Sequence, residues 1–175
     1  MNAFARLLLA IEFAAGRHRH QRRKDAEASP YINHPIALAA LLAETGGVDD
    51  LVTLQAAILH DTLEDTETTY DELFHLFGKE VADVVLEVTD DKTLEPAMRK
   101  HLQVEHAPHK SERAALVKLA DKTCNLRDIV TSAPAGWSLE RQREYFDWAK
   151  RVVDGLPKVN AAMESAFDDA WRARP

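Results

Sequence analysis

Residues 49–61 read DDLVTLQAAILHD, and this stretch decides the fold class. Its apolar positions Leu51, Leu54 and Ile58 recur at steps of three and four, which is the spacing of one face of an α-helix. An aspartate precedes the run, where a residue that caps a helix N-terminus is preferred. The stretch therefore predicts a helix over about residues 50–61 that buries one face in a core.

The same helical spacing of apolar residues continues through the rest of the chain. Glycine is scarce, with 6 in 175 residues, and no clear run alternates between apolar and polar positions as a half-buried strand does. The pattern predicts nine helices, over about residues 2–16, 35–45, 50–61, 70–76, 79–87, 94–106, 111–131, 139–154 and from 157 onward. There is no internal repeat and no linker long enough to separate domains, so we expect one all-α domain over residues 1–175.

Composition narrows the class of protein. Hydrophobic residues make up 46% and charged residues 29%, which is typical of a folded globular domain. No apolar run approaches the roughly 18 residues of a membrane span, and the N-terminal stretch lacks the basic and cleavage regions of a signal peptide. The single cysteine excludes an internal disulfide and fits a reducing compartment. We therefore expect a cytoplasmic protein without a membrane partner, and the net charge of -7 argues against a nucleic-acid partner.

The helix predicted over about residues 50–61 ends in two groups that can bind a metal, His60 and Asp61. Two carboxylates, Glu64 and Asp65, follow four residues after them. If the helix continues without a break, each carboxylate lies one turn beyond one candidate ligand, at about 5–6 Å. At that distance from a metal, a carboxylate can deprotonate a water molecule or protonate a leaving group. The spacing therefore predicts a metal site with an acid–base pair beside it.

The same acidic residues are unfavourable for stability where they stand. Asp61, Glu64, Asp65 and Glu67 crowd the C-terminal end of a helix, where the helix dipole is already negative. Like charges at helical spacing also repel one another. A local preference broken in this way is typical of a functional site, and a divalent cation would offset the repulsion.

Other parts of the chain offer further ligands. His34 directly precedes Pro35 at the expected start of a helix, and Asp121 lies among apolar residues in the middle of another, with Asn125 one turn later. An aspartate in such a position is either buried with a partner or coordinates an ion. Two imidazoles and two carboxylates suit a catalytic Mn, Fe or Zn ion, whereas a thiolate zinc site is excluded by the cysteine count.

Residues 17–24, which read RHRHQRRK, carry five positive charges in an acidic protein. A run of this kind is most often a solvated face, and it could also be a patch that binds nucleic acid. A metal-dependent phosphohydrolase, however, needs local cations to hold a polyanionic substrate beside its acidic metal site. Because the run precedes His34 by only ten residues, we favour phosphate binding beside the metal.

Several stretches together resemble the HD-domain phosphohydrolases. Within that family they are similar to the small alarmone hydrolases, which are stand-alone relatives, including metazoan ones, of the hydrolase domain of the Rel/Spo enzymes. The matching stretches are residues 21–25, 30–36, 59–66, 77–78, 87–92, 117–122, 136–138, 144–149 and 155–156. The resemblance extends over nearly the whole chain, which is too short for the synthetase and regulatory domains of the long Rel/Spo proteins.

The resemblance implies an all-α HD fold and a Mn(II)-dependent hydrolase, with Fe or Zn as the other candidate metals. The substrate that it implies is (p)ppGpp, guanosine 5′-di- or triphosphate 3′-diphosphate, from which the 3′-pyrophosphate is released to leave GDP or GTP. It also implies site residues: His34, His60, Asp61 and Asp121 as metal ligands, Glu64 and Asp65 as the pair that activates water and handles protons, and Arg23, Lys24, Asn125, Arg141 and Tyr145 beside the nucleotide.

Two other functions remain open at this point. The first is a phosphatase on another nucleotide, such as the 2′-phosphate of NADPH, or another HD nucleotidase. The second is a binding module without catalysis that uses the basic run to hold nucleotides or nucleic acid. The oligomeric state is left open as well.

Overall fold

The computed structural model describes residues 2–175, and within them it is helical, with no β-strand beyond an isolated bridge between Arg22 and Pro30. The all-α prediction is confirmed. The elements are α1 (Ala3–Arg17), α2 (Asn33–Glu44), α3 (Leu51–Leu59), α4 (Thr62–Asp65), α5 (Tyr70–Phe77), α6 (Lys79–Val88), α7 (Pro96–His106), the 3-10 helix η1 (Ala107–His109), α8 (Glu112–Ser132), α9 (Leu139–Gly155) and α10 (Ala161–Arg172).

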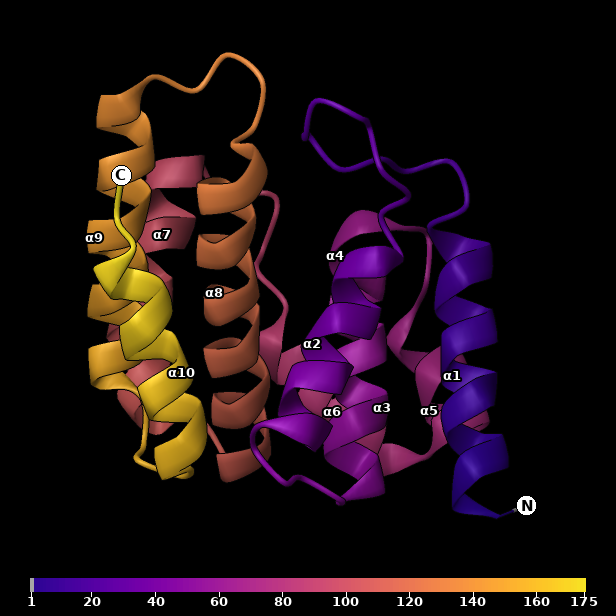
Figure 1. The fold of residues 1–175 in the computed structure, drawn as a ribbon. Coiled ribbons are helices and arrows are strands. Elements are labelled where there is room, and N and C mark those ends of the chain that lie inside the picture. Colours follow the sequence, from indigo (N-terminus) through magenta and orange to yellow (C-terminus); the bar gives the residue numbers. More distant parts are fainter. Residues whose placement is uncertain (1) are drawn as a thin grey trace.

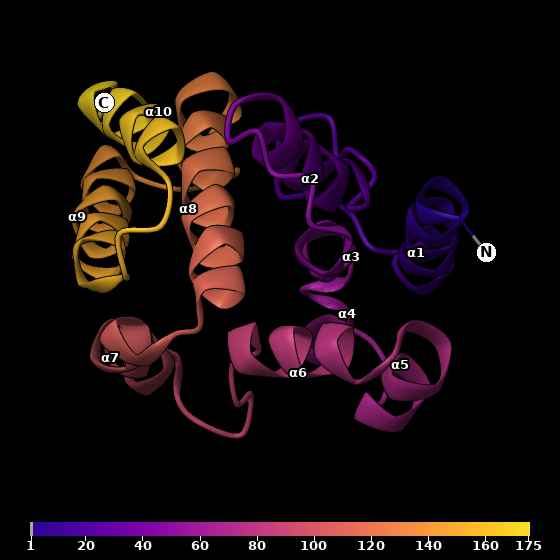
Figure 2. The same cartoon turned by 90° about the horizontal axis from the view of Figure 1, so that it is seen from below.

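Helix α8 runs through the centre of the molecule and separates two groups of helices (Figures 1 and 2). It packs against α2, α3 and α6 on one side and against α9 and α10 on the other. Helix α1 lies outside α3, and α7 packs against α9. The four-residue helix α4 follows α3 directly, at the end of the molecule where the connection between α1 and α2 also lies (Figure 1).

Helix α3 is buried on more than one side, which differs from the single buried face that its sequence predicts. Of the three predicted core positions, Ile58 is buried, whereas Leu51 and Leu54 are only partly buried. Thr53 and Gln55 are buried instead. The reason is that α1, α2, α6 and α8 all contact this helix, so its environment is not that of an amphipathic surface helix.

Capping side chains set the starts of several helices. Asp50 caps α3, where its Oδ2 accepts a hydrogen bond from the backbone N–H of Thr53 at 3.1 Å. The last helix begins at Ala161, so the prediction of a start at Pro157 is wrong. Asn160 caps this helix by accepting the N–H of Met163 at 3.0 Å, and the residues after Pro157 form an extended connection.

None of the helices in residues 2–175 combines the length and the apolar character that a membrane crossing requires.

Candidate active site

Three predicted metal ligands come together where α2, α3 and α8 meet. His34 is the second residue of α2, His60 caps the C-terminus of α3, and Asp121 lies in the middle of α8. All three are buried, and one ligand atom from each lies within 4.8 Å of the others. His34 Nε2 is 3.2 Å from Asp121 Oδ1, and His60 Nε2 is 4.0 Å from the same oxygen. We call these residues the His–His–Asp cluster.

The two imidazoles of the cluster are held so that ring nitrogens remain without hydrogen-bond partners. His60 Nδ1 lies 2.8 Å from the carbonyl oxygen of Ala57, to which it donates, so its Nε2 faces the cluster. His60 Nε2 and His34 Nδ1 are buried and form no hydrogen bond within residues 2–175. A histidine whose second nitrogen is fixed by a backbone carbonyl is the usual arrangement around a protein-bound metal.

Asp61, the fourth predicted ligand, adjoins the cluster through His60. Its Oδ2 lies 2.9 Å from His60 Nε2, in an ion-pair contact. The same oxygen accepts a hydrogen bond from the hydroxyl of Tyr31. Asp61 is partly buried, and the Tyr31 contact fixes the orientation of its carboxylate.

In the cluster, nearby charges oppose the effect of burial on the pKa values of the titratable groups. Burial alone would lower the pKa of His60, but the charges of Asp61 and Asp121 outweigh it and raise the pKa of His60 to about 9. Burial likewise disfavours both carboxylates in their charged form. His60 nevertheless holds the pKa of Asp61 well below its usual range, and Lys122 has the same effect on the pKa of Asp121. Both carboxylates are therefore held in their charged form, which is the form that binds a cation.

Helix α8 supplies the groups that orient Asp121. Lys122 Nζ lies 3.0 Å from Asp121 Oδ2, and Asn125 Nδ2 donates to Asp121 Oδ1 at 2.7 Å. Lys122 is itself buried, with its ammonium group 4.4 Å from the centre of the Trp148 ring. Asp121 is thus fixed on both carboxylate oxygens before any ligand binds.

The helix that carries His60 ends at Leu59, which corrects the continuous helix that the spacing suggests. Asp61 has φ −97° and ψ 0°, and the one-turn helix α4 begins after it. The hydroxyl of Thr62 donates to the carbonyl of Leu59 at 2.7 Å, and so satisfies one of the carbonyls left free by the break. One turn of helix is still completed across the break, because the N–H of Asp65 donates to the carbonyl of Asp61 at 2.8 Å.

Glu64 turns from α4 towards the loop after α6. Its Oε2 accepts the backbone N–H of Asp90 at 3.2 Å, and its Oε1 lies 3.7 Å from Arg99 of α7. Burial raises the pKa of Glu64, and the charge of Asp90 adds to the effect. A carboxyl group whose pKa is raised holds its proton more readily, as a general acid or base requires.

Asp65, the next residue, faces the segment between α1 and α2. Its Oδ2 accepts a hydrogen bond from Gln21 Nε2 at 2.9 Å, and its other oxygen is paired with Lys92. Gln21 Oε1 in turn lies 2.6 Å from Nδ1 of the buried His18. The two carboxylates predicted to act as a pair therefore point to different surroundings.

A large cleft of about 640 Å³ opens beside His34 and Asp65. Four of the five residues predicted to contact substrate line it, namely Arg23, Lys24, Asn125 and Tyr145. Arg23 lies 2.5 Å from Asp128 and 3.3 Å from Asn125, so its guanidinium group is tied to α8. The volume is within the range of small-molecule sites, roughly 300–1,000 Å³.

Arg141, the fifth predicted substrate residue, does not line this cleft. Its guanidinium carbon lies 4.5 Å from the centre of the Trp137 ring, and Trp137 is part of the cleft wall. Arg141 therefore stacks behind the wall, on the exposed end of α9. The structure places it next to the cleft but assigns it no contact inside.

Sequence reasoning gave no role to Tyr31, Gln21 and Lys122, although all three contact predicted site residues. Tyr31 and Gln21 stand in stretches that match the family pattern, so their presence there was the available signal. Lys122 follows Asp121 directly, and a lysine in the buried middle of a helix already indicates a charged partner.

Comparison with known proteins places the chain in a family. Residues 10–148 match the HD domain family. The human guanosine-3′,5′-bis(diphosphate) 3′-pyrophosphohydrolase MESH1 is 55% identical over 170 residues, which are 97% of this chain and 95% of the human protein. The MESH1 protein of Drosophila melanogaster is 46% identical, again over 97% of this chain and 95% of that protein.

Two further comparisons bear on the fold and on the larger relatives. A solved structure described as a metazoan ortholog of SpoT that hydrolyzes ppGpp superposes with a TM-score of 0.94 at 46% identity, covering 97% of this chain and 96% of the other. The bifunctional (p)ppGpp synthase/hydrolase SpoT of Escherichia coli is 40% identical over 135 residues, which are 74% of this chain but 19% of SpoT.

The donor set agrees with the family. Two imidazoles and a fixed carboxylate are ligands that a divalent metal prefers, and a metal would give the unpartnered Nε2 of His60 a partner once its proton is released. On the domain match, the identity to relatives along nearly the whole chain and the superposition of the fold, this chain belongs to the HD-domain family.

Proposed function

We propose that this protein hydrolyses (p)ppGpp with a bound Mn(II) ion, releasing the 3′-pyrophosphate and leaving GDP or GTP. The observation that carries the proposal is that His34 of the buried His–His–Asp cluster lines a cleft whose wall also includes Arg22, Arg23 and Lys24. Relatives with this name are 54–55% identical over nearly their whole length, which supports the same substrate for this chain. A site with two imidazoles and carboxylates also suits Mn(II).

His34, His60, Asp61 and Asp121 would hold the metal in this proposal. When bound, a divalent cation supplies a Lewis acid that acidifies a water molecule and polarises a phosphoryl oxygen. Lys122, Asn125 and Tyr31 orient the carboxylate ligands through the contacts described above.

Hydrolysis requires two proton movements, for which the acidic pair is placed. A bond forms between the oxygen of water and the phosphorus attached to O3′, and the bond between that phosphorus and O3′ breaks. Glu64 or Asp65 accepts the proton from the water, and a proton is returned to O3′, which leaves as a hydroxyl group. The raised pKa of Glu64 fits it to carry a proton during this exchange.

The cleft positions the nucleotide. Arg23 and Lys24 offer positive charge in its lining, and Asn125 and Tyr145 offer hydrogen-bonding groups. We further infer that residues 1–175 act as one catalytic domain, because the cleft is built from both the segment before α2 and the distant helices α8 and α9.

The direct test is to incubate the Mn-loaded protein with ppGpp and identify the products. We expect GDP and pyrophosphate in equal amounts, and we expect Asp61→Ala to abolish the reaction. Asp83→Asn is a matched control, because Asp83 is a surface carboxylate of α6 that pairs with Lys79 and Tyr70. Release of orthophosphate, or faster turnover of NADPH than of ppGpp, would overturn the proposal.

A further inference from the structure

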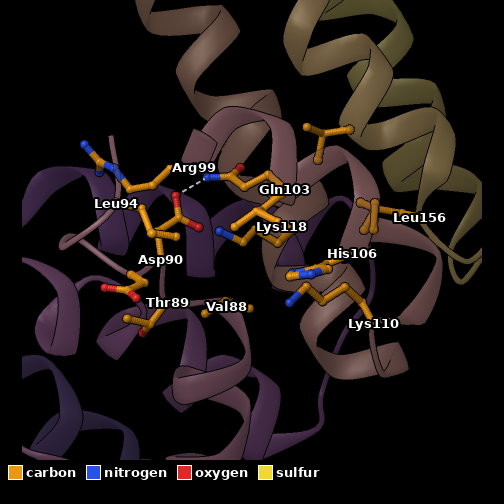
Figure 3. Close-up of a pocket in the computed structure, with 14 residues that line it drawn as sticks. Val88, Thr89, Asp90, Leu94, Arg99, Gln103, His106, Lys110, Lys118 and Leu156 are labelled. Atoms are coloured by element: carbon orange, nitrogen blue, oxygen red, sulfur yellow. Dashed lines mark hydrogen bonds between the residues drawn. The ribbon is translucent and has the colours of Figure 1, made fainter. Parts of the chain in front are cut away.

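A second, smaller recess lies between the C-terminal end of α6, helix α7 and the N-terminal half of α8. Its volume is about 180 Å³, and the mechanism above does not use it. Apolar side chains, including Val88 and Leu156, form part of its lining (Figure 3). Lys110 and Lys118 carry positive charge into its lining, and Arg99 borders it. We call it the small recess.

The small recess adjoins the catalytic pair at Glu64. Two of the residues that line it, Asp90 and Arg99, are the residues that contact the Glu64 carboxylate. Asp65, the next residue in the chain, lines the large cleft instead. The end of α4 therefore lies next to both spaces, because Glu64 contacts two residues that line the small recess and Asp65 lines the large cleft.

The cationic side chains of the recess form few hydrogen bonds and ion pairs. Within residues 2–175 the Lys118 ammonium group forms no side-chain hydrogen bond or ion pair. Arg99 Nε is buried without a partner, and the guanidinium group of Arg99 lies 3.7 Å from Glu64. Lys110 donates only to the backbone carbonyl of Glu87. Asp90 also lines the recess, but one of its oxygens accepts a hydrogen bond from Gln103 (Figure 3). An unpaired ammonium group in such a place is unfavourable unless an anion can reach it.

The surroundings of Lys118 disfavour the charged form of its ammonium group. Burial lowers the pKa of Lys118, and the positive charge of Lys122 lowers it further, while the negative charges of Asp90, Asp121 and Asp61 offset these effects only in part. Lys118 lines the recess and stands one helical turn before Asp121 of the His–His–Asp cluster on α8. A bound anion would restore the balance of charge at this position.

We propose that the small recess binds the outer phosphate of the substrate's 3′-diphosphate and then holds the pyrophosphate product, with Lys118 and Arg99 as its cationic contacts. This inference rests on the proposed function for its substrate. The recess is smaller than the roughly 300–1,000 Å³ of sites that enclose whole small molecules, so it can admit a diphosphate but not the nucleoside. In this arrangement the nucleoside stays in the large cleft. The phosphorus that is attacked lies between the large cleft and the small recess, beside Glu64 and Asp65.

The test is direct binding of inorganic pyrophosphate, measured by titration calorimetry on the full chain with and without Mn(II). Lys118→Met and Arg99→Met should each weaken pyrophosphate binding by about tenfold or more, which is the usual effect of losing a hydrogen bond to a charged group. GDP binding should change by less than about twofold in both variants. Lys79→Met is the matched control, because it removes one charge from an exposed part of α6 and should change neither.

Two features keep the outcome decisive. Arg99 lies on α7, which has no buried residues, so Arg99→Met should fold even if Lys118→Met does not, and thermal melting checks both. Equal pyrophosphate binding in wild type and Arg99→Met would overturn the inference, as would a parallel loss of GDP binding. Pyrophosphate binding and ppGpp hydrolysis are measured separately. Pyrophosphate binding can therefore be unaffected by the variants while ppGpp hydrolysis is confirmed, and a protein that does not hydrolyse ppGpp can still be tested for pyrophosphate binding.

Discussion

Metal-free protein should lose stability as the pH rises through the titration of His60. The folded-state pKa of His60 is raised to about 9 from a usual 6.5, chiefly because Asp61 and Asp121 favour the protonated ring. Stability from a raised pKa is fully present below the unfolded-state value and is lost as the pH passes the folded-state value. The interval between 6.5 and 9 corresponds, at about 1.4 kcal/mol for each tenfold change, to about 3 kcal/mol.

The assay is urea unfolding of chelator-treated protein at about pH 6 and about pH 9.5, compared between wild type and Asp61→Asn. Asp61→Asn removes the main charge that acts on His60, so it should flatten the difference between the two pH values. Asp65→Asn is the control, because Asp65 pairs with Gln21 and Lys92 rather than with His60. Equal pH dependence in wild type and Asp61→Asn would refute the reasoning.

The same titration affects metal binding. A histidine must give up its proton to coordinate a cation, so the proton on His60 competes with the metal below about pH 9. The apparent affinity for Mn(II) should therefore rise by up to about tenfold for each pH unit up to about pH 9. A pH-independent affinity would show that His60 is not protonated in the metal-free state.

Three further perturbations have expected outcomes. Gln21→Leu removes the donor to Asp65 Oδ2 and should lower kcat by about tenfold with a smaller change in KM, measured by steady-state kinetics; an unchanged kcat would show that this contact is dispensable. Asp50→Ala removes the cap that accepts the Thr53 N–H and should cost about 1–2 kcal/mol in urea unfolding without changing the metal affinity. Burial raises the pKa of the Cys124 thiol to about 12, so iodoacetamide at pH 8 should alkylate it far more slowly in the folded protein than in urea, and equal rates would contradict its burial.

The sequence predicted the parts of the site that depend on residue type. His34, His60 and Asp121 stand in three separate helices, and their chemistry alone indicated that they could share an ion. The helices themselves followed from apolar spacing, and most of their ends lie within a few residues of the predicted ones. What made this possible is that capping residues and apolar periods act locally, so they can be read without knowledge of the fold.

The break at His60 and Asp61 could not be predicted in the same way. No glycine or proline marks it, and each residue from Leu59 to Asp65 is acceptable in a helix. It is stabilised by contacts that only the folded chain shows, such as Thr62 to the Leu59 carbonyl and His60 to the Ala57 carbonyl. The separate surroundings of Glu64 and Asp65 depend on tertiary contacts as well, and so does the small recess.

Helix α8 holds residues from every part of the site at fixed distances from one another. Lys118, Asp121, Asn125 and Asp128 all project from it, and the axial distance from the first to the last is about 15 Å at the rise of an α-helix. One rigid element therefore sets the spacing between the small recess, the His–His–Asp cluster and the large cleft. Surface loops can change in length without altering that spacing, whereas one residue inserted into α8 between Lys118 and Asp128 would rotate half of the site away from the other half by about 100°.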